Sequence, residues 1–297
     1  MKSHSYLMIS SGAAMWGLIG IFIKALNDAG FSSMEITTIR AVTASSILFL
    51  YMALRNRSML RIRLGDIKYF LATGILSMVF FNWCYFTAIN EISLSIAVVL
   101  LYTAPAFVIV ISRFVFKEKI TRYKVLALIL TAAGSCLTAG LLPGMDIKLS
   151  LYGIVVGIGS GFGYSLYSIF AKLAARKYSP LTITAYTFFN AAIFLLIFSS
   201  PTDKLSLLLR WDILLYCIGL GLIPTSLAYI LYTAGLRNVE TGKAAIIANI
   251  EPAVAILIGT ALFGEILTAS QITGAALIFV SVFIVQSGEK KIQVERE

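Results

Sequence analysis

Long apolar runs separated by short polar segments follow one another along the chain as far as residue 287. Each run holds about 20 residues, which is the length an α-helix needs to cross the hydrocarbon core of a bilayer. The runs are continuous rather than alternating in polarity, so they do not match the strands of a membrane β-barrel. The pattern predicts ten membrane-spanning helices, at Ser5–Ile23, Ile36–Leu54, Tyr69–Asn90, Ile92–Ser112, Val125–Met145, Leu149–Ala171, Tyr178–Ser199, Ile213–Leu236, Ala244–Gly264 and Ile266–Ser287.

The composition agrees with a fold that is surrounded by lipid. Of the 297 residues, 59% are hydrophobic and only 13% are charged, whereas soluble domains contain about 25% charged residues. No polar stretch is long enough to form a separate soluble domain. We therefore expect an all-α integral membrane protein whose main partner is the lipid bilayer.

The 24 basic residues predict the orientation of the spans. With the N-terminus in the cytoplasm, 19 of them fall on the cytoplasmic side, 4 fall outside, and Arg40 lies within a span. Because cytoplasmic loops are enriched in Lys and Arg, we expect a multi-pass protein of the cytoplasmic (inner) membrane with both termini inside. The net charge of +10 then reflects topology. We expect no nucleic-acid partner, because the basic clusters are not interleaved with base-stacking side chains.

The two halves of the chain align when one is displaced by 147 residues. The paired positions include Tyr85 with Tyr232, Pro105 with Pro252 and Glu118 with Glu265. We expect two repeats, residues 1–146 and 147–297, and five spans in each make the second repeat inverted relative to the first. Inverted repeats allow one central cavity to open to either side in turn, with the substrate near the midplane.

Two stretches in this register resemble the signature ends of a known domain. They are LYTAPAFVIVISRFVFKEKIT at 101–121 and NIEPAVAILIGTALFGEILT at 249–268, and both are similar to the ends of EamA domains in the drug/metabolite transporter superfamily. The resemblance covers essentially the whole chain and is greatest to the branch that contains the aromatic amino-acid exporter YddG. It implies ten helices around a central cavity and the movement of small metabolites, often outward.

Two charged residues within spans are candidates for binding a substrate. Glu251 lies in the ninth span beside Pro252, and a carboxylate at this depth usually faces a cavity or a partner. We expect it to bind a cationic group or a coupling proton; the alternative is a carboxyl that braces neighbouring helices. Arg40 interrupts the second span. It either binds a substrate carboxylate, pairs with an acidic residue or snorkels to the interface. Lys24 and Lys172 are typical of interfacial anchors.

Prolines, tyrosines, tryptophan and amides inside the spans complete the candidate site. Pro105 and Pro252 remove a backbone donor within a helix, so they mark either hinges or fixed kinks in the fourth and ninth spans. Buried Tyr, Trp and Asn side chains need partners for their polar atoms, which favours a wet cavity over lipid, although packing is the alternative. The expected cavity residues of this kind are Trp16, Asn82, Tyr85, Tyr102, Tyr164, Asn190, Tyr229, Tyr232 and Asn249.

These residues predict a secondary transporter, an exporter of small amphipathic metabolites such as amino acids. No Walker phosphate loop occurs, so no ATP drive is encoded. The alternatives are a carrier for amines or quaternary ammonium cations, or a channel. A membrane enzyme, a metal site and a cofactor are not expected, because His4 is the single histidine and the three cysteines match no ligand motif. Whether the protein is a monomer or a dimer stays open.

Overall fold

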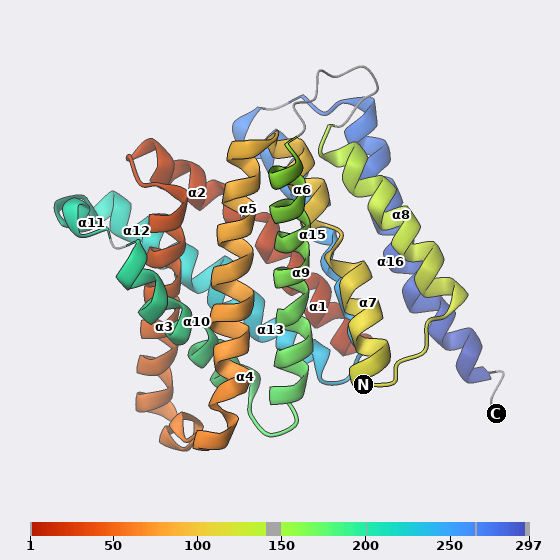
Figure 1. The fold of residues 1–297 in the computed structure, drawn as a ribbon, viewed down its shortest axis with the longest axis horizontal. Helices are drawn as coiled ribbons and strands as arrows, with labels where there is room; N and C mark the ends of the chain where they lie inside the picture. Colours follow the sequence, from red (N-terminus) through yellow and green to blue (C-terminus); the bar gives the residue numbers. More distant parts are fainter. Residues whose placement is uncertain (1, 141–149, 200, 265, 295–297) are drawn as a thin grey trace.

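The computed structural model describes residues 2–140, 150–199, 201–264 and 266–294 (Figure 1). This part of the chain is helical and contains no strand. The helices of the first half are α1 (Lys2–Gly17), α2 (Ile19–Asp28), α3 (Ser33–Arg55), η1 (Arg57–Leu60), η2 (Leu64–Asp66), α4 (Ile67–Leu71), η3 (Ala72–Val79), α5 (Phe80–Glu91), α6 (Leu94–Leu101), α7 (Ala104–Val115) and α8 (Arg122–Thr138). Those of the second half are α9 (Leu151–Ala174), α10 (Pro180–Phe198), η4 (Thr202–Lys204), α11 (Leu205–Leu208), α12 (Trp211–Leu220), η5 (Gly221–Leu227), α13 (Ala228–Leu236), α14 (Thr241–Ala248), α15 (Ile250–Phe263) and α16 (Ala269–Val294).

Nine helical segments of the described residues are long and apolar enough to cross a membrane. They are Ser3–Asp28, Ser33–Arg55, Leu64–Glu91, Leu94–Val115, Leu151–Ala174, Pro180–Phe198, Trp211–Leu236, Thr241–Phe263 and Ala269–Ser287. The remaining predicted span, at Val125–Met145, corresponds to α8. This helix has 17 residues, about 25 Å at 1.5 Å per residue, and the end of the predicted span from residue 141 lies outside the described residues.

The fourth and ninth spans are each broken into two helices at the same place in their repeats. Leu101 and Ala248 are the last residues of α6 and α14. Their carbonyls lie four residues before Pro105 and Pro252, which have no amide hydrogen to donate to them. The prolines therefore stand in the first turn of α7 and α15, after a break rather than inside a continuous helix. Hinge motion at these breaks stays a prediction.

A second pair of equivalent irregularities lies in the third and eighth spans. Both contain a π-helical segment, η3 in one and η5 in the other. In η5 the hydroxyls of Thr225 and Ser226 donate to the carbonyls of Leu220 and Gly221, each at 2.7 Å. Such wide turns are frequent at functional sites, and η5 carries one of the partners of Arg40 described below.

Around a shared centre, helices of each half pack against helices of the other half. Helix α9 of the second half packs against α5, α6 and α7, and α1 of the first half packs against α13, α14 and α15. Helices α3 and α10 also lie against each other, while α8 and α16 lie side by side at one edge of the molecule (Figure 1). Because elements of both halves surround the centre, any cavity there is lined by both repeats.

Candidate functional site

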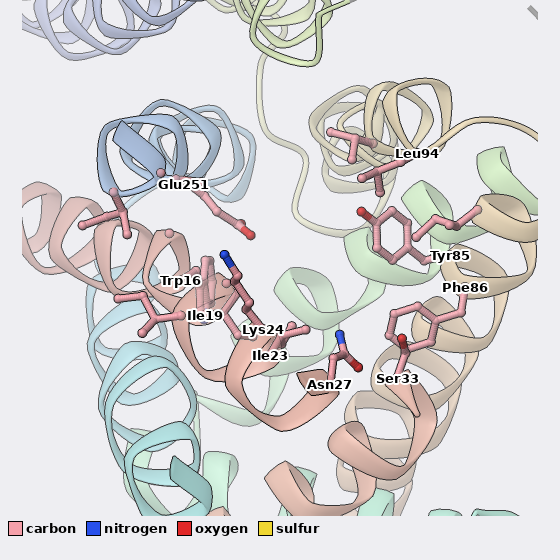
Figure 2. A pocket seen from close by; sticks show the side chains of 18 of the residues that line it. Trp16, Ile19, Ile23, Lys24, Asn27, Ser33, Tyr85, Phe86, Leu94 and Glu251 are labelled. Carbon is pink, nitrogen blue, oxygen red and sulfur yellow. The ribbon is translucent and has the colours of Figure 1, made fainter. Parts of the chain in front are cut away.

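A cavity of about 1020 Å³ lies between α1, α2, α5, α6 and α15 (Figure 2). Polar residues from the end of α2, the start of α3 and the end of α5 line its mouth. These are Lys24, Asn27, Ser32, Ser33 and Asn90. Its lining also includes Trp16, Tyr85, Tyr102 and Glu251. The charge distribution predicts that this mouth faces outward.

A smaller pocket of about 180 Å³ adjoins the deep part of the cavity and shares several of its residues. It brings together eight of the residues that the sequence predicted for the site. They are Trp16, Arg40, Asn82, Tyr85, Tyr102, Tyr164, Tyr229 and Glu251. The lining comes from α1, α2, α3, α5, α6, α9, α13 and α15, so both halves of the chain contribute to one site.

Glu251 stands in the first turn of α15, directly after the break in the ninth span. A carboxylate at this position is favoured by the partial positive charge of the helix N-terminus. Tyr164 Oη donates to Glu251 Oε2 at 3.4 Å. Among the described residues, no basic side chain lies within 4.0 Å of the carboxylate. Glu251 therefore retains free acceptor capacity on the cavity side.

Arg40 is buried at the inner end of the same site, with 8% of its surface exposed. Its Nε donates to Thr225 Oγ1 at 3.0 Å and its Nη2 to Tyr229 Oη at 3.5 Å. The guanidinium carbon lies 5.7 Å from the ring centroids of Phe188 and Tyr229. No carboxylate of the described chain lies within 4.0 Å of it. This burial does not fit a side chain that snorkels to the interface.

The ring of Trp16, which lines the site together with these two charged residues, packs against three tyrosines. The ring centroid of Trp16 lies 4.9 Å from that of Tyr229, 5.1 Å from that of Tyr232 and 6.3 Å from that of Tyr164. The indole Nε1 of Trp16 is buried and has no hydrogen-bond partner within the described residues. A buried donor without a partner is costly, so a ligand acceptor that reached it would be stabilised.

Three predicted cavity residues line neither of the two pockets. Tyr232 is buried, and its hydroxyl pairs with that of Ser168 at 2.7 Å. Asn190 donates to the carbonyl of Tyr186 at 2.6 Å and lines neither pocket. Asn249 is buried at the break before α15, and its side-chain nitrogen lacks a partner among the described residues. None of the three contributes to the cavity wall in this conformation.

The opposite end of the molecule is closed by a buried carboxylate, that of Glu118. It accepts hydrogen bonds from the amides of Thr241 and Gly242 at 2.6 and 3.2 Å. The ammonium groups of Lys172 and Lys124 lie 3.4 and 3.6 Å from its oxygens. Glu118 follows α7 of the first half, whereas three of these four partners belong to the second, so the contacts join the two repeats.

Opposing effects act on the pKa of Glu118. Burial raises it, but the hydrogen bond from the Thr241 amide, the charge of Lys172 and the hydrogen bond from the Gly242 amide lower it more. The net pKa of Glu118 therefore lies below its ordinary value, and the carboxyl is ionised at neutral pH. The sequence repeat singled out Glu118, but it gave no sign of these partners.

Lys24 was predicted to be an interfacial anchor, but it lines the cavity mouth. Its ammonium lies 4.1 Å from the ring centroid of Phe263. At 1.5 Å per residue, the Cα of Phe263 is about 18 Å along α15 from that of Glu251. The sequence signal that could have placed Lys24 here is its polar neighbour Asn27, one turn further along α2.

The sequence profile of the EamA-like transporter family matches residues 4–140 and 151–287. An uncharacterized transporter of Archaeoglobus fulgidus is 30% identical over 276 residues, which cover 92% of this chain and 92% of that protein. The uncharacterized transporter YwfM of Bacillus subtilis is 23% identical, over 98% of this chain and 97% of its own. A solved crystal structure superposes with a TM-score of 0.81 at 15% identity, covering 98% of this chain and 99% of the other, which shows a shared fold. This chain is a membrane protein of the EamA-like transporter family.

Proposed function

We propose that this transporter exports small amphipathic metabolites such as amino acids across the cytoplasmic membrane by alternating access. The observation that carries the proposal is one cavity, lined by both inverted repeats, which opens at one end while contacts of Glu118 close the other. A carrier of this type exposes one central site to each side in turn. The excess of basic residues on one side supports a cytoplasmic location for both termini and an outward-facing mouth.

The chemistry of the inner pocket supports an amino acid as the cargo. Arg40 and Glu251 line the same pocket, and neither forms an ion pair within the described residues. A guanidinium suits a carboxylate, and a carboxylate suits an ammonium group. The apolar part of the molecule would lie against the neighbouring side chains of Ile19, Ile23 and Val98.

Glu251 also offers a route for energy coupling. Movement follows the substrate gradient or is coupled to a proton, because the chain has no Walker phosphate loop. A carboxyl that faces a cavity and has no basic partner can bind a proton in place of a substrate cation. Proton coupling predicts that a pH gradient drives substrate accumulation, whereas facilitated diffusion predicts no such effect.

A carrier for amines or quaternary ammonium cations is the second candidate. It is favoured by the rings of Trp16, Tyr85 and Tyr102, which line the cavity together with Glu251. Cations bind over such ring faces. This cargo would leave Arg40 without an anion, so an amine binding more tightly than its parent amino acid would favour the second candidate over the first.

Flux from liposomes tests the proposal. The purified protein is reconstituted, the vesicles are loaded with a labelled amino acid, and efflux is measured with and without unlabelled compound outside. A carrier predicts saturable efflux that the outside compound accelerates, and Glu251→Gln should reduce it. Ohmic current without saturation would instead indicate a channel. Absence of protein-dependent flux for amino acids and amines alike would contradict the proposal.

A further inference from the structure

Glu118 lies at the end of the molecule opposite the cavity mouth. Leu94, the first residue of α6, lines the cavity near its mouth. The span Leu94–Val115 has 22 residues, which corresponds to about 33 Å of helix. Glu118 follows its far end, so the membrane thickness separates it from the mouth.

The carboxylate of Glu118 joins the two repeats at this end, beside the ion pair of Lys124 with Glu240 at 3.1 Å. Its side chain is only 8% exposed. The Thr241 hydroxyl donates to it at 2.8 Å, in addition to the two amides described above. These amides begin α14, so a residue of the first repeat caps a helix of the second. Such charge-assisted bonds are among the strongest in proteins.

The helices that Glu118 connects also pack directly against each other. A Cβ added to Gly242 would lie 2.9 Å from Cγ1 of Ile109 on α7. No cavity can open between α7 and α14 unless these surfaces separate. Separation would remove the amides of Thr241 and Gly242 from Glu118, so opening between these helices also breaks contacts of Glu118.

Lys172 and Lys24 lie over equivalent rings, Phe116 at 5.5 Å and Phe263 at 4.1 Å from the ring centroid. At the closed end, Lys172 also contacts the carboxylate of Glu118. Glu265, the counterpart of Glu118 in the repeat, lies outside the described residues.

We propose that Glu118 is the latch of the gate at this end, a positioning residue that holds the cavity open to the mouth side. The inference rests on the proposed alternating-access function. Loss of the latch shifts the equilibrium toward the state in which the cavity opens at the Glu118 end. Glu118 does not touch the substrate, so the latch acts on the distribution between states and not on the binding pocket.

The test compares the accessibility of the two ends in vesicles. One cysteine is introduced at the mouth (Asn27→Cys) and another near the closed end (Ser168→Cys), where Ser168 lies one turn before Lys172 and is 6% exposed. A membrane-impermeant thiol reagent is applied to each face separately. Protein without the added cysteine corrects for Cys84, Cys136 and Cys217.

Glu118→Gln should raise labelling of the cysteine at 168 by about tenfold or more and lower labelling of the cysteine at 27, because breaking a buried charge pair shifts equilibria by orders of magnitude. Asp212→Asn is the matched control. It removes an exposed pair with Arg210 inside one repeat, so neither labelling rate should change. Lys172→Gln provides a second variant if Glu118→Gln does not fold, and it should shift both rates in the same directions.

The outcomes distinguish a residue that controls which end of the cavity is open from one that only stabilises the fold. A simultaneous rise in the labelling rate at both ends would show that Glu118 only stabilises the fold. Unchanged labelling rates in a folded variant would also overturn the proposal. The reciprocal shift without any flux in liposomes would leave the latch standing and remove the proposed function. Flux without the reciprocal shift in labelling would support the proposed function and overturn the role of Glu118 as a latch.

Discussion

Replacing Glu251 by Gln changes the charge of the site while preserving its shape. Gln can still accept the hydrogen bond from Tyr164, which is 3.4 Å long and contributes little. A charge at mid-membrane depth costs about 2.5–3.5 kcal/mol, and the helix N-terminus offsets about 0.3–1 kcal/mol of this. The fold should therefore be as stable in the variant as in the parent protein, or more so.

Substrate binding should respond in the opposite direction. A hydrogen bond to a charged group contributes about 1.5–3 kcal/mol, so loss of the ammonium contact should raise Kd by about 10- to 150-fold. At a ligand concentration of 100 times the parent Kd, ligand stabilises the parent by about 2.7 kcal/mol. A 100-fold weaker variant would gain only about 0.4 kcal/mol at that concentration.

Thermal unfolding with and without ligand measures this difference. Glu91→Gln is the matched control, because Glu91 is exposed at the end of α5 and accepts a hydrogen bond from the Ser150 hydroxyl at 3.3 Å. The control should keep the full ligand-induced shift. Equal ligand-induced shifts in Glu251→Gln and in the parent would refute a role for this carboxylate in binding.

Three further changes have definite expected results. Arg40→Gln should weaken binding of a carboxylate-bearing ligand by about 10-fold or more, whereas Arg40→Lys should retain part of it, as titration calorimetry would show. Because the pKa of Glu118 is lowered from about 4.5, its stabilising contribution is complete above that pH and is lost as the pH falls through the lower, folded-state pKa. Unfolding of Glu118→Gln should therefore depend less on pH in this acid range than unfolding of the parent. Gly161→Ala should cost about 1–3 kcal/mol in thermal unfolding, because its Cβ would lie 2.8 Å from the Leu100 carbonyl oxygen, whereas Gly20→Ala meets open space and should not destabilise.

The features that the sequence predicted well depend on local chemistry. Apolar runs define nine of the spans within the described residues, because the bilayer sets their length. The breaks in the fourth and ninth spans follow from Pro105 and Pro252, whose missing amides act on carbonyls four residues away. Burial of Glu251 beside a cavity follows from the cost of a charge in lipid.

The features that were missed depend on partners distant in the chain. Arg40 can be buried because the hydroxyls of Thr225 and Tyr229, about 185 residues away in the chain, accept hydrogen bonds from its guanidinium. The equivalent tyrosines Tyr85 and Tyr232 have the same local pattern, yet one lines the cavity and the other is packed. The repeats are related in sequence but differ in environment, because the cavity opens at one end only. No pattern along the chain reports which end that is.

A single cysteine at Ala255 offers the most direct measurement of alternating access. Ala255 lines the cavity one turn beyond Glu251. In Ala255→Cys vesicles, an impermeant thiol reagent should label this position from the mouth side and also, more slowly, from the opposite side. Glu118→Gln should increase the second rate and decrease the first. Labelling from one face only, in both the parent and the latch variant, would contradict a cavity that opens to each side in turn.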